Sequence, residues 1–174
     1  QLLALYGSGR VERGIGLDLA EKMLALGRDK IKAAGLTDRL TLQHGSAEAI
    51  PFDDNSFDAV SITFGIRNVT DVTRTLAEMY RVLKPGGRAM ILEFSLPESG
   101  LLRGPYLFYL RHVLPHLGRL FSGDNSAYRY LNRTIETFPY GEAFCRLMRE
   151  VGFAHTVANP QTFGVATIYV GDKP

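Results

Sequence analysis

The sequence predicts an α/β domain with a mainly parallel sheet, and two observations support this prediction. Short β-rich apolar runs alternate with segments whose apolar residues recur every three or four positions, which is typical of strand–helix–strand units. The last two β-rich runs are joined by too few residues for a crossover helix, so they should form an antiparallel pair. Right-handed crossovers would place helices on both faces of the sheet.

The N-terminal half contains an apolar stub at residues 2–6 and a turn at Gly7-Ser8-Gly9. The elements expected next are a strand over 11–18, a helix over 20–34, strands over 40–44 and 57–64, a helix over 72–83 and a strand over 88–94. Gly35 is a natural stop for the first of these helices. Lys84-Pro85-Gly86-Gly87 should end the second helix and turn the chain into its next strand.

The C-terminal half begins with an irregular helical insertion over 101–138, where aromatic residues alternate with arginine and histidine. A helix over 144–151 should end at Gly152. Two strands, over 153–158 and 163–170, should follow, with Asn159-Pro160 in the turn between them.

Length and composition indicate one globular domain over 1–174 that lacks its first strand. The chain has 174 residues, 45% of them apolar, with 20 basic and 18 acidic residues, so bulk charge gives no support to nucleic-acid binding. Its single cysteine, Cys145, excludes an intramolecular disulfide and a four-cysteine zinc site, and suits a reducing cytosol. No apolar run reaches the roughly 18 residues of a membrane span, and no signal peptide is evident. We therefore expect a cytoplasmic protein.

Candidate site residues follow the strands, because ligands of open parallel sheets bind at the carboxyl ends. These ends carry Asp18, then Ser46-Ala47-Glu48, then Thr63 to Asn68, then Glu93-Phe94-Ser95. Asp18 could accept two hydrogen bonds from a ribose diol, or it could complement the dipole of the helix that follows. The ribose interpretation also fits a nicotinamide enzyme, so Asp18 indicates an adenosine without identifying the cofactor.

Gly7-Ser8-Gly9 looks like the glycine loop that precedes such an acidic residue, but the spacing argues against it. That loop is followed by a helix and a strand, which place the acid about 20 residues on. Asp18 lies eleven residues after Gly7. We therefore expect the first strand and the true glycine loop to lie upstream of residue 1.

Longer motifs resemble a known family. Class I S-adenosylmethionine-dependent methyltransferases share motifs such as Gly16-Leu17-Asp18, Gly45-Ser46-Ala47-Glu48-Ala49-Ile50-Pro51-Phe52, Asp54-Asn55-Ser56-Phe57-Asp58 and Leu83-Lys84-Pro85-Gly86-Gly87. Phe64-Gly65-Ile66-Arg67-Asn68-Val69, Leu92-Glu93-Phe94-Ser95 and Tyr128-Arg129-Tyr130-Leu131 are narrower and resemble the UbiE/COQ5 family. This family C-methylates the ring of a polyprenyl quinol in menaquinone and ubiquinone biosynthesis.

The resemblance implies a Rossmann-like class I methyltransferase fold, with an antiparallel C-terminal strand, that uses S-adenosylmethionine. Asp18 corresponds to the ribose-binding acid, Ser46 and Ala47 to the adenine contacts, and Thr63 to a cofactor-contacting hydroxyl. Arg67 and Asn68 belong to the active-site segment. One departure is Ala20, where the family usually has serine.

The implied reaction is methylation of a polyprenyl quinol, with demethylmenaquinol preferred over a ubiquinone precursor. Arg67 would stabilise the phenolate, with the general base left open, or it would pair with a carboxylate at the sheet edge. The 101–138 insertion would form a lid over the quinol. The alternatives are another small-molecule methyltransferase of this fold and a catalytically incomplete fragment.

The remaining expectations concern partners and metals. Arg103, Arg111 and Arg119 recur every eight residues, which is compatible with peripheral membrane contact or with a solvated face. A homodimer is also compatible with the sequence. No metal site is expected, because Pro115 interrupts the helix that would align His112 with His116.

Overall fold

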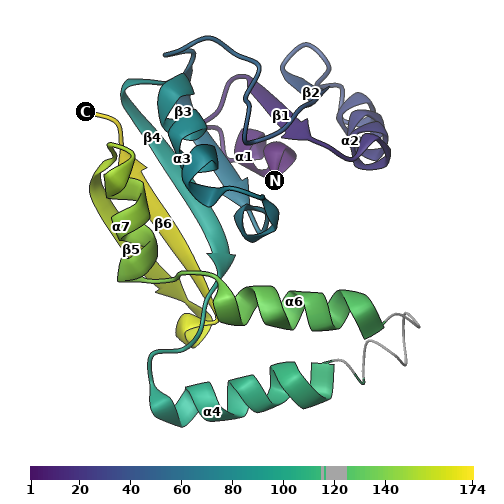
Figure 1. The fold of residues 1–174 in the computed structure, drawn as a ribbon. Coiled ribbons are helices and arrows are strands. Elements are labelled where there is room, and N and C mark those ends of the chain that lie inside the picture. The colour runs from purple at the N-terminus through teal and green to yellow at the C-terminus, as the bar shows by residue number, and fades with distance from the viewer. Residues whose placement is uncertain (115, 117–124) are drawn as a thin grey trace. The chain divides into compact units, whose positions relative to one another are not determined.

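A computed structural model describes residues 1–114, 116 and 125–174 of the chain, shown in Figure 1. The chain divides into two compact units, Gln1–Asp53 and Asp54–Pro174. Each unit has its own sheet, of two strands in the first unit and four in the second. None of the helices in the described part of the chain has the length and apolarity that a membrane span requires.

The first unit contains two helices and a parallel pair of strands. Its elements are α1 (Leu2–Gly7), β1 (Gly14–Asp18), α2 (Glu21–Ala33) and β2 (Leu40–His44). The two strands run in register from Gly14 opposite Leu40 to Asp18 opposite His44, so their carboxyl ends coincide. Helix α2 can approach β2 closely because Gly27 has no side chain: a Cβ there would lie 2.4 Å from Leu42 Cδ1.

Two boundaries in this unit differ from prediction. The apolar stub at residues 2–6 forms helix α1, which extends to Gly7, the first residue of the predicted turn. Strand β1 begins at Gly14, three residues later than predicted, because Val11 to Arg13 have no partners in β2, whose pairing starts at Leu40. The predicted helix over 20–34 and the strand over 40–44 are confirmed.

The second unit has a mixed sheet with the strand order β3-β4-β6-β5. Its strands are β3 (Phe57–Thr63), β4 (Leu83–Phe94), β5 (Ala154–Gln161) and β6 (Ala166–Asp172). Strands β3 and β4 are parallel, whereas β6 is antiparallel to both β4 and β5. The predicted parallel sheet with an antiparallel C-terminal pair is therefore confirmed.

Helices α3 (Val72–Val82) and α7 (Glu142–Glu150) contact each other and lie over the same face of this sheet in Figure 1. Each buries an apolar stripe, with Leu76 and Met79 on α3 and Phe144 and Met148 on α7. The Phe144 ring packs 4.5 Å, centroid to centroid, from Tyr169 of β6. These side chains belong to the buried core of the second unit.

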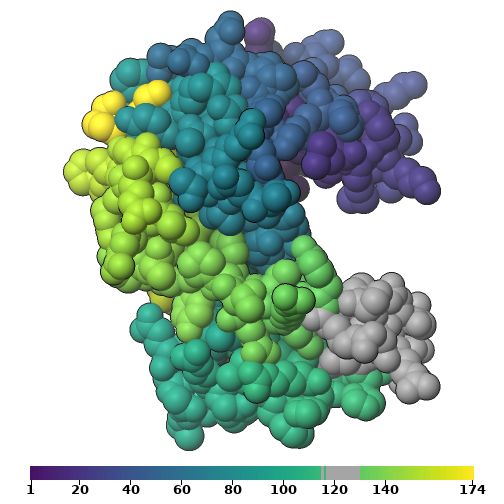
Figure 2. All heavy atoms as spheres, in the orientation of Figure 1, coloured from purple at the N-terminus to yellow at the C-terminus, as the bar shows by residue number. Residues whose placement is uncertain are grey.

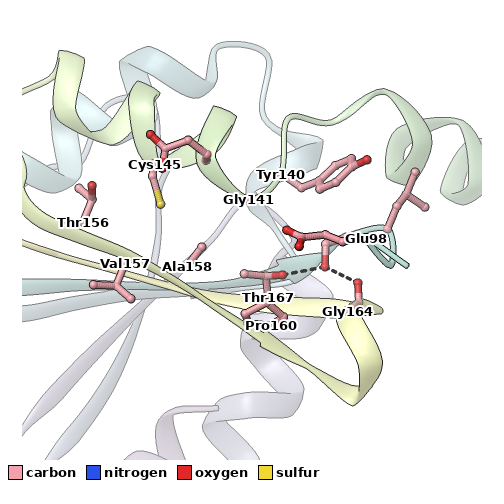
Figure 3. A pocket seen from close by; sticks show the side chains of 13 residues that line it. Glu98, Tyr140, Gly141, Cys145, Thr156, Val157, Ala158, Pro160, Gly164 and Thr167 are labelled. Atoms are coloured by element: carbon pink, nitrogen blue, oxygen red, sulfur yellow. Dashed lines mark hydrogen bonds between the residues drawn. The ribbon is translucent and has the colours of Figure 1, made fainter. Parts of the chain in front are cut away.

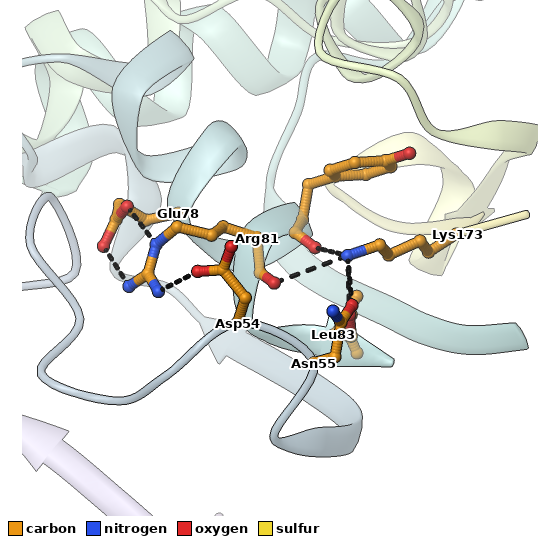
Figure 4. Close-up of polar contacts among 7 residues, drawn as sticks. Asp54, Asn55, Glu78, Arg81, Leu83 and Lys173 are labelled. Atoms are coloured by element: carbon orange, nitrogen blue, oxygen red, sulfur yellow. Dashed lines mark hydrogen bonds and ion pairs between the residues drawn. The ribbon is translucent and has the colours of Figure 1, made fainter. Parts of the chain in front are cut away.

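The carboxyl end of α3 is capped by a lysine from the C-terminus of the chain (Figure 4). The Lys173 ammonium donates hydrogen bonds to the carbonyl oxygens of Tyr80, at 3.0 Å, and Leu83, at 2.7 Å. It also donates to Asn55 Oδ1, at 2.9 Å. The positive charge satisfies carbonyl groups that a helix end leaves unpaired and complements the helix dipole.

The segment after α3 corrects one prediction. Lys84-Pro85-Gly86-Gly87 lies inside β4, not in a turn before it. The parallel pairing shifts between Phe57 opposite Leu83 and Ala59 opposite Arg88, so residues 84–87 of β4 bulge opposite the single residue Asp58 of β3. Gly86 has φ +78° and donates to Lys173 O, so the chain end holds the bulge in place.

The final hairpin corrects a second prediction. Asn159 and Pro160 are paired strand residues of β5, opposite Ile168 and Thr167. The turn lies instead at η3 (Thr162–Gly164), which includes residues with positive φ. Proline is tolerated in β5 because this strand is at the edge of the sheet, where one missing N–H breaks no second ladder.

The predicted insertion over 101–138 is helical in its described part. It contains α4 (Gly100–Phe108), the π-helical η2 (Tyr109–Val113) and α6 (Asn125–Thr137). Leu96, Leu110 and Ile135 form a buried cluster of their own between these helices and the end of β4. Pro115 and Arg119, which the sequence analysis placed in this insertion, lie outside the described residues.

Candidate functional site

In the first unit, three of the predicted cofactor residues lie together at the carboxyl ends of β1 and β2. Asp18 is the last residue of β1, and its carbonyl oxygen accepts a hydrogen bond from Gly45 N at 3.2 Å. Ser46 and Ala47 follow directly and are half-buried. The parallel register of the two strands brings these residues to one edge.

The Asp18 carboxylate is exposed, and only one of its oxygens has a hydrogen bond among the described residues. Its Oδ1 accepts from Ala20 N, the residue before α2, at 2.8 Å. This contact agrees with the predicted role at a helix start and leaves lone pairs on both oxygens for a diol. Ser46 Oγ accepts from Glu48 N at 3.1 Å, so its hydroxyl proton stays available to a ligand.

In the second unit, the other predicted residues follow β3. Thr63 ends this strand, and Arg67 and Asn68 belong to η1 (Ile66–Asn68), a single 3₁₀ turn. Between them Phe64 has φ +53°, a conformation that costs a bulky residue energy and persists only where its surroundings enforce it. Such strain is typical of ligand and active sites.

Arg67 is anchored by a carboxylate that is completely buried. Its Nη1 donates to Glu93 Oε1 at 2.7 Å and to the Phe64 carbonyl oxygen at 2.8 Å. Its backbone N–H donates to Glu93 Oε2 at 3.3 Å. The exposed fraction is 11% for the Arg67 side chain and zero for Glu93. Arg67 thus pairs with a carboxylate, as the structural alternative expected, and its role toward a quinol stays a prediction.

Aromatic rings complete the surroundings of the guanidinium. Arg67 Cζ lies 5.1 Å from the centroid of the Phe94 ring, and that ring packs 4.5 Å from Phe64. Arg67 Nε is buried and has no acceptor among the described residues. A buried N–H without an acceptor is costly, and an oxygen that reached this group would relieve the cost.

Asn68 connects this turn to the helical insertion. The Tyr130 hydroxyl of α6 donates to Asn68 Oδ1 at 3.3 Å. The contact is exposed, so it is easily broken. It links the predicted lid to the turn that carries Arg67.

The structure therefore brings together Asp18, Ser46 and Ala47 in one unit, and Thr63, Arg67 and Asn68 in the other. That the two groups serve one ligand remains a prediction. Sequence reasoning missed the pairing of Glu93 with Arg67, although it placed Glu93 at a strand end. The signal that could have found it is an acidic residue inside an otherwise apolar strand, because a buried carboxylate requires a cationic or hydrogen-bonding partner.

A cavity of about 330 Å³ lies elsewhere in the second unit, between α7 and the β5–β6 hairpin. Figure 3 shows Glu98 and Tyr140 at one end and Cys145 and Thr156 at the other. Burial raises the pKa of the Cys145 thiol, and Glu142 raises it further, so this thiol is protonated at neutral pH and is a poor nucleophile. Of the residues predicted at the strand ends, Ser95 lines this cavity, whereas Asp18, Ser46, Ala47, Thr63, Arg67 and Asn68 do not.

Among the described residues, no three histidine, cysteine or acidic side chains gather closely enough to hold a metal ion.

Several solved structures resemble this chain at low sequence identity. A putative S-adenosyl-L-methionine-dependent methyltransferase from Methanococcus maripaludis is 21% identical with a TM-score of 0.63, covering 91% of this chain and 66% of its own. A SAM-dependent methyltransferase from Thermotoga maritima is 20% identical with a TM-score of 0.59, covering 92% and 72%. These likenesses show the fold, that of the class I methyltransferases.

Curated relatives are much more similar in sequence. The ubiquinone/menaquinone biosynthesis C-methyltransferase UbiE of Geobacter sulfurreducens is 52% identical over 159 residues, which are 91% of this chain and 62% of the relative. The demethylmenaquinone methyltransferase of Bacteroides fragilis is 41% identical over 162 residues, covering 93% and 66%. The chain thus spans somewhat less than two thirds of the length of these two relatives. A profile of the ubiE/COQ5 methyltransferase family matches residues 6–173, and the chain belongs to that family.

Proposed function

We propose that this protein methylates a ring carbon of a polyprenyl quinol with S-adenosylmethionine, and that demethylmenaquinol is its acceptor. The observation that carries the proposal is the family match over nearly the whole chain, together with relatives named for this chemistry. When bound, S-adenosylmethionine supplies an electrophilic methyl group on a positively charged sulfur. The residues of this chain bind that donor, orient the quinol and stabilise charge.

Asp18, Ser46, Ala47 and Thr63 are the residues we assign to the donor. The Asp18 carboxylate is exposed and has spare lone pairs, which fits a ribose diol. The Ser46 hydroxyl can still donate a hydrogen bond, which fits a polar edge of adenine. Thr63 is half-buried at the end of β3 and offers a further hydroxyl.

Arg67 is the residue we assign to the quinol. A quinol carbon becomes nucleophilic when the neighbouring hydroxyl loses its proton, and a guanidinium beside the oxygen stabilises that anion. Arginine stays protonated in proteins, so Arg67 acts through its charge and a water molecule is a suitable base. Asn68, on the same turn, is the residue we assign to the same ring.

The helical insertion is the part we assign to the prenyl tail. The buried cluster of Leu96, Leu110 and Ile135 gives this insertion an apolar interior. The contact between Tyr130 and Asn68 would couple lid position to the turn that carries Arg67.

We also propose a cytoplasmic protein whose helix α4 contacts the inner face of the membrane. Leu101 and Phe108 are 84% and 62% exposed and lie seven residues apart on α4, hence on one side of the helix. The segment that contains α4 is part of the teal-green surface at the bottom of Figure 2. Arg111 is paired with Glu136 at 2.5 Å, so it contributes less to lipid binding than its spacing predicted. Co-sedimentation with anionic vesicles tests this contact, and sedimentation velocity tests whether the protein is a homodimer.

The deciding experiment supplies S-adenosylmethionine with a trideuterated methyl group and either demethylmenaquinol or a demethylated ubiquinol precursor. The expected result is a labelled product from demethylmenaquinol. Label in the ubiquinol precursor alone would reverse the choice of acceptor. Calorimetric binding of S-adenosylmethionine without label in either quinol would favour another acceptor, and binding of NADH in its place would end the methyltransferase assignment.

A further inference from the structure

We propose that Glu93 is a positioning residue for methyl transfer, which fixes the Arg67 guanidinium so that one edge of it remains directed at the oxygen of the acceptor. This inference rests on the proposed function, because it assigns a role within that site. It follows from the hydrogen bonds of the two side chains and from their burial.

Glu93 is held on both carboxylate oxygens. Its Oε1 accepts from Arg67 Nη1, at 2.7 Å, and from Phe94 N, at 2.9 Å. Its Oε2 accepts from Arg67 N, at 3.3 Å. The exposed fraction of this side chain is zero, so the carboxylate does not meet a ligand directly and acts through its partner.

Arg67 is held at one nitrogen and over one ring. The two protons of Nη1 are used by Glu93 and by the Phe64 carbonyl oxygen. The guanidinium lies over Phe94, so the plane of the group is restrained as well. These contacts leave the edge formed by Nε and Nη2, on which the buried Nε has no acceptor among the described residues. A charged oxygen at this edge gains a strong hydrogen bond.

The Phe64 backbone supports the same arrangement. Its positive φ turns the chain directly after β3 and brings its carbonyl oxygen to Arg67. Arg67 is therefore held by two hydrogen-bond acceptors, the Phe64 carbonyl oxygen after β3 and the Glu93 carboxylate of β4. These two strands are paired in parallel.

Charge compensation explains why a carboxylate is suited to this position. An arginine that is 11% exposed and unpaired would be strongly destabilised and would turn toward water. Glu93 removes that tendency, at the cost of weakening the positive potential at the acceptor. The benefit of holding the Arg67 guanidinium in one direction outweighs the loss of positive potential, because misplacing a catalytic group by about 1 Å can cost about 100-fold in rate.

The test compares Glu93→Gln with the unaltered full-length protein in the demethylmenaquinol assay. Glutamine has nearly the same shape as glutamate, but its NH2 group replaces one carboxylate oxygen. That NH2 group would face the N–H groups of Arg67 or Phe94, which need an acceptor. We expect kcat to fall about 100-fold while KM changes by less than about threefold. The affinity for S-adenosylmethionine, measured by calorimetry, should stay unchanged. The matched control is Asp172→Asn, which breaks the Arg88–Asp172 pair of the same unit and should leave kcat unchanged.

A double-mutant cycle separates positioning from a purely structural role. In an Arg67→Lys background, Glu93→Gln should lower kcat by less than about threefold, because the geometry it maintained is already lost. If Glu93→Gln does not fold, as thermal unfolding will show, Glu93→Asp replaces it in the same cycle and should also lower kcat at constant KM. A kcat near the original value, or an equal loss in both backgrounds, would overturn the role of Glu93. An unaltered protein that methylates neither quinol overturns the proposed function, and this inference with it.

Discussion

Asp18 and Arg67 both carry charge near the carboxyl end of a strand, yet their surroundings are opposite. Asp18 is exposed and has one hydrogen bond, from a neighbouring backbone N–H. Arg67 is 11% exposed, pairs with a carboxylate that is fully buried, and lies over an aromatic ring. An exposed charge can change its partner at little cost, whereas a buried pair cannot lose one member without a large penalty. Substitutions at Asp18 should therefore affect binding alone, and substitutions at the pair should affect stability and turnover.

The largest expected effect follows from Arg67→Met. Turnover of demethylmenaquinol should be abolished, because the phenolate loses its stabilising charge, while binding of S-adenosylmethionine remains largely intact. The methylation assay and calorimetric titration measure the two quantities. Turnover near the original rate would refute the role of Arg67.

The next effect concerns stability of the buried pair. Glu93→Leu should lower the free energy of unfolding by about 3–5 kcal/mol, because it leaves a buried arginine without its counter-charge. Arg67→Met combined with Glu93→Leu should recover most of that loss, since an apolar pair of similar volume needs no compensation. Urea unfolding measures both values. A double variant as unstable as Glu93→Leu would show that the pair is not energetically coupled.

A smaller effect is expected at the exposed acid. Asp18→Asn should weaken binding of S-adenosylmethionine by about 10- to 100-fold, the range for losing a charge-assisted hydrogen bond. The melting temperature should hardly change, because the amide oxygen can still accept from Ala20 N. Asp29→Asn, an exposed residue of α2, is the control. Unchanged affinity for S-adenosylmethionine would show that Asp18 does not bind this donor.

The smallest effect concerns pH. The hydrogen bond from Arg88 lowers the pKa of Asp172 below its ordinary value, so the pair stabilises the fold above the ordinary aspartate pKa. That stabilisation is lost as pH falls through the lowered pKa. Asp172→Asn should therefore be less stable than the unaltered protein at pH near 7, and this difference should be smaller at pH near 3. Urea midpoints at both pH values measure the difference, and an equal gap at both would contradict the assignment.

The local patterns of the sequence predicted most elements well. Helices α2 and α3 and strand β2 end within a residue or two of their predicted limits, because apolar periodicity and glycine stops are set by nearby residues. The turn predicted at Asn159-Pro160 was wrong because proline is compatible with β5 only where this strand lies at the edge of the sheet, and the position of a strand in the sheet is a tertiary feature. The sequence carries no direct mark of strand order.

The sequence by itself determined the fold class and the residue types at the strand ends, including Asp18, Arg67 and Glu93, since these follow from pattern and motif. Only the tertiary structure decided that Arg67 and Glu93, which are 26 residues apart, form a buried pair. The parallel register of β3 and β4 brings their carboxyl ends together, and the burial of the two side chains then makes the contact strong. Pairing of this kind depends on distances between segments, which the order of residues along the chain does not contain.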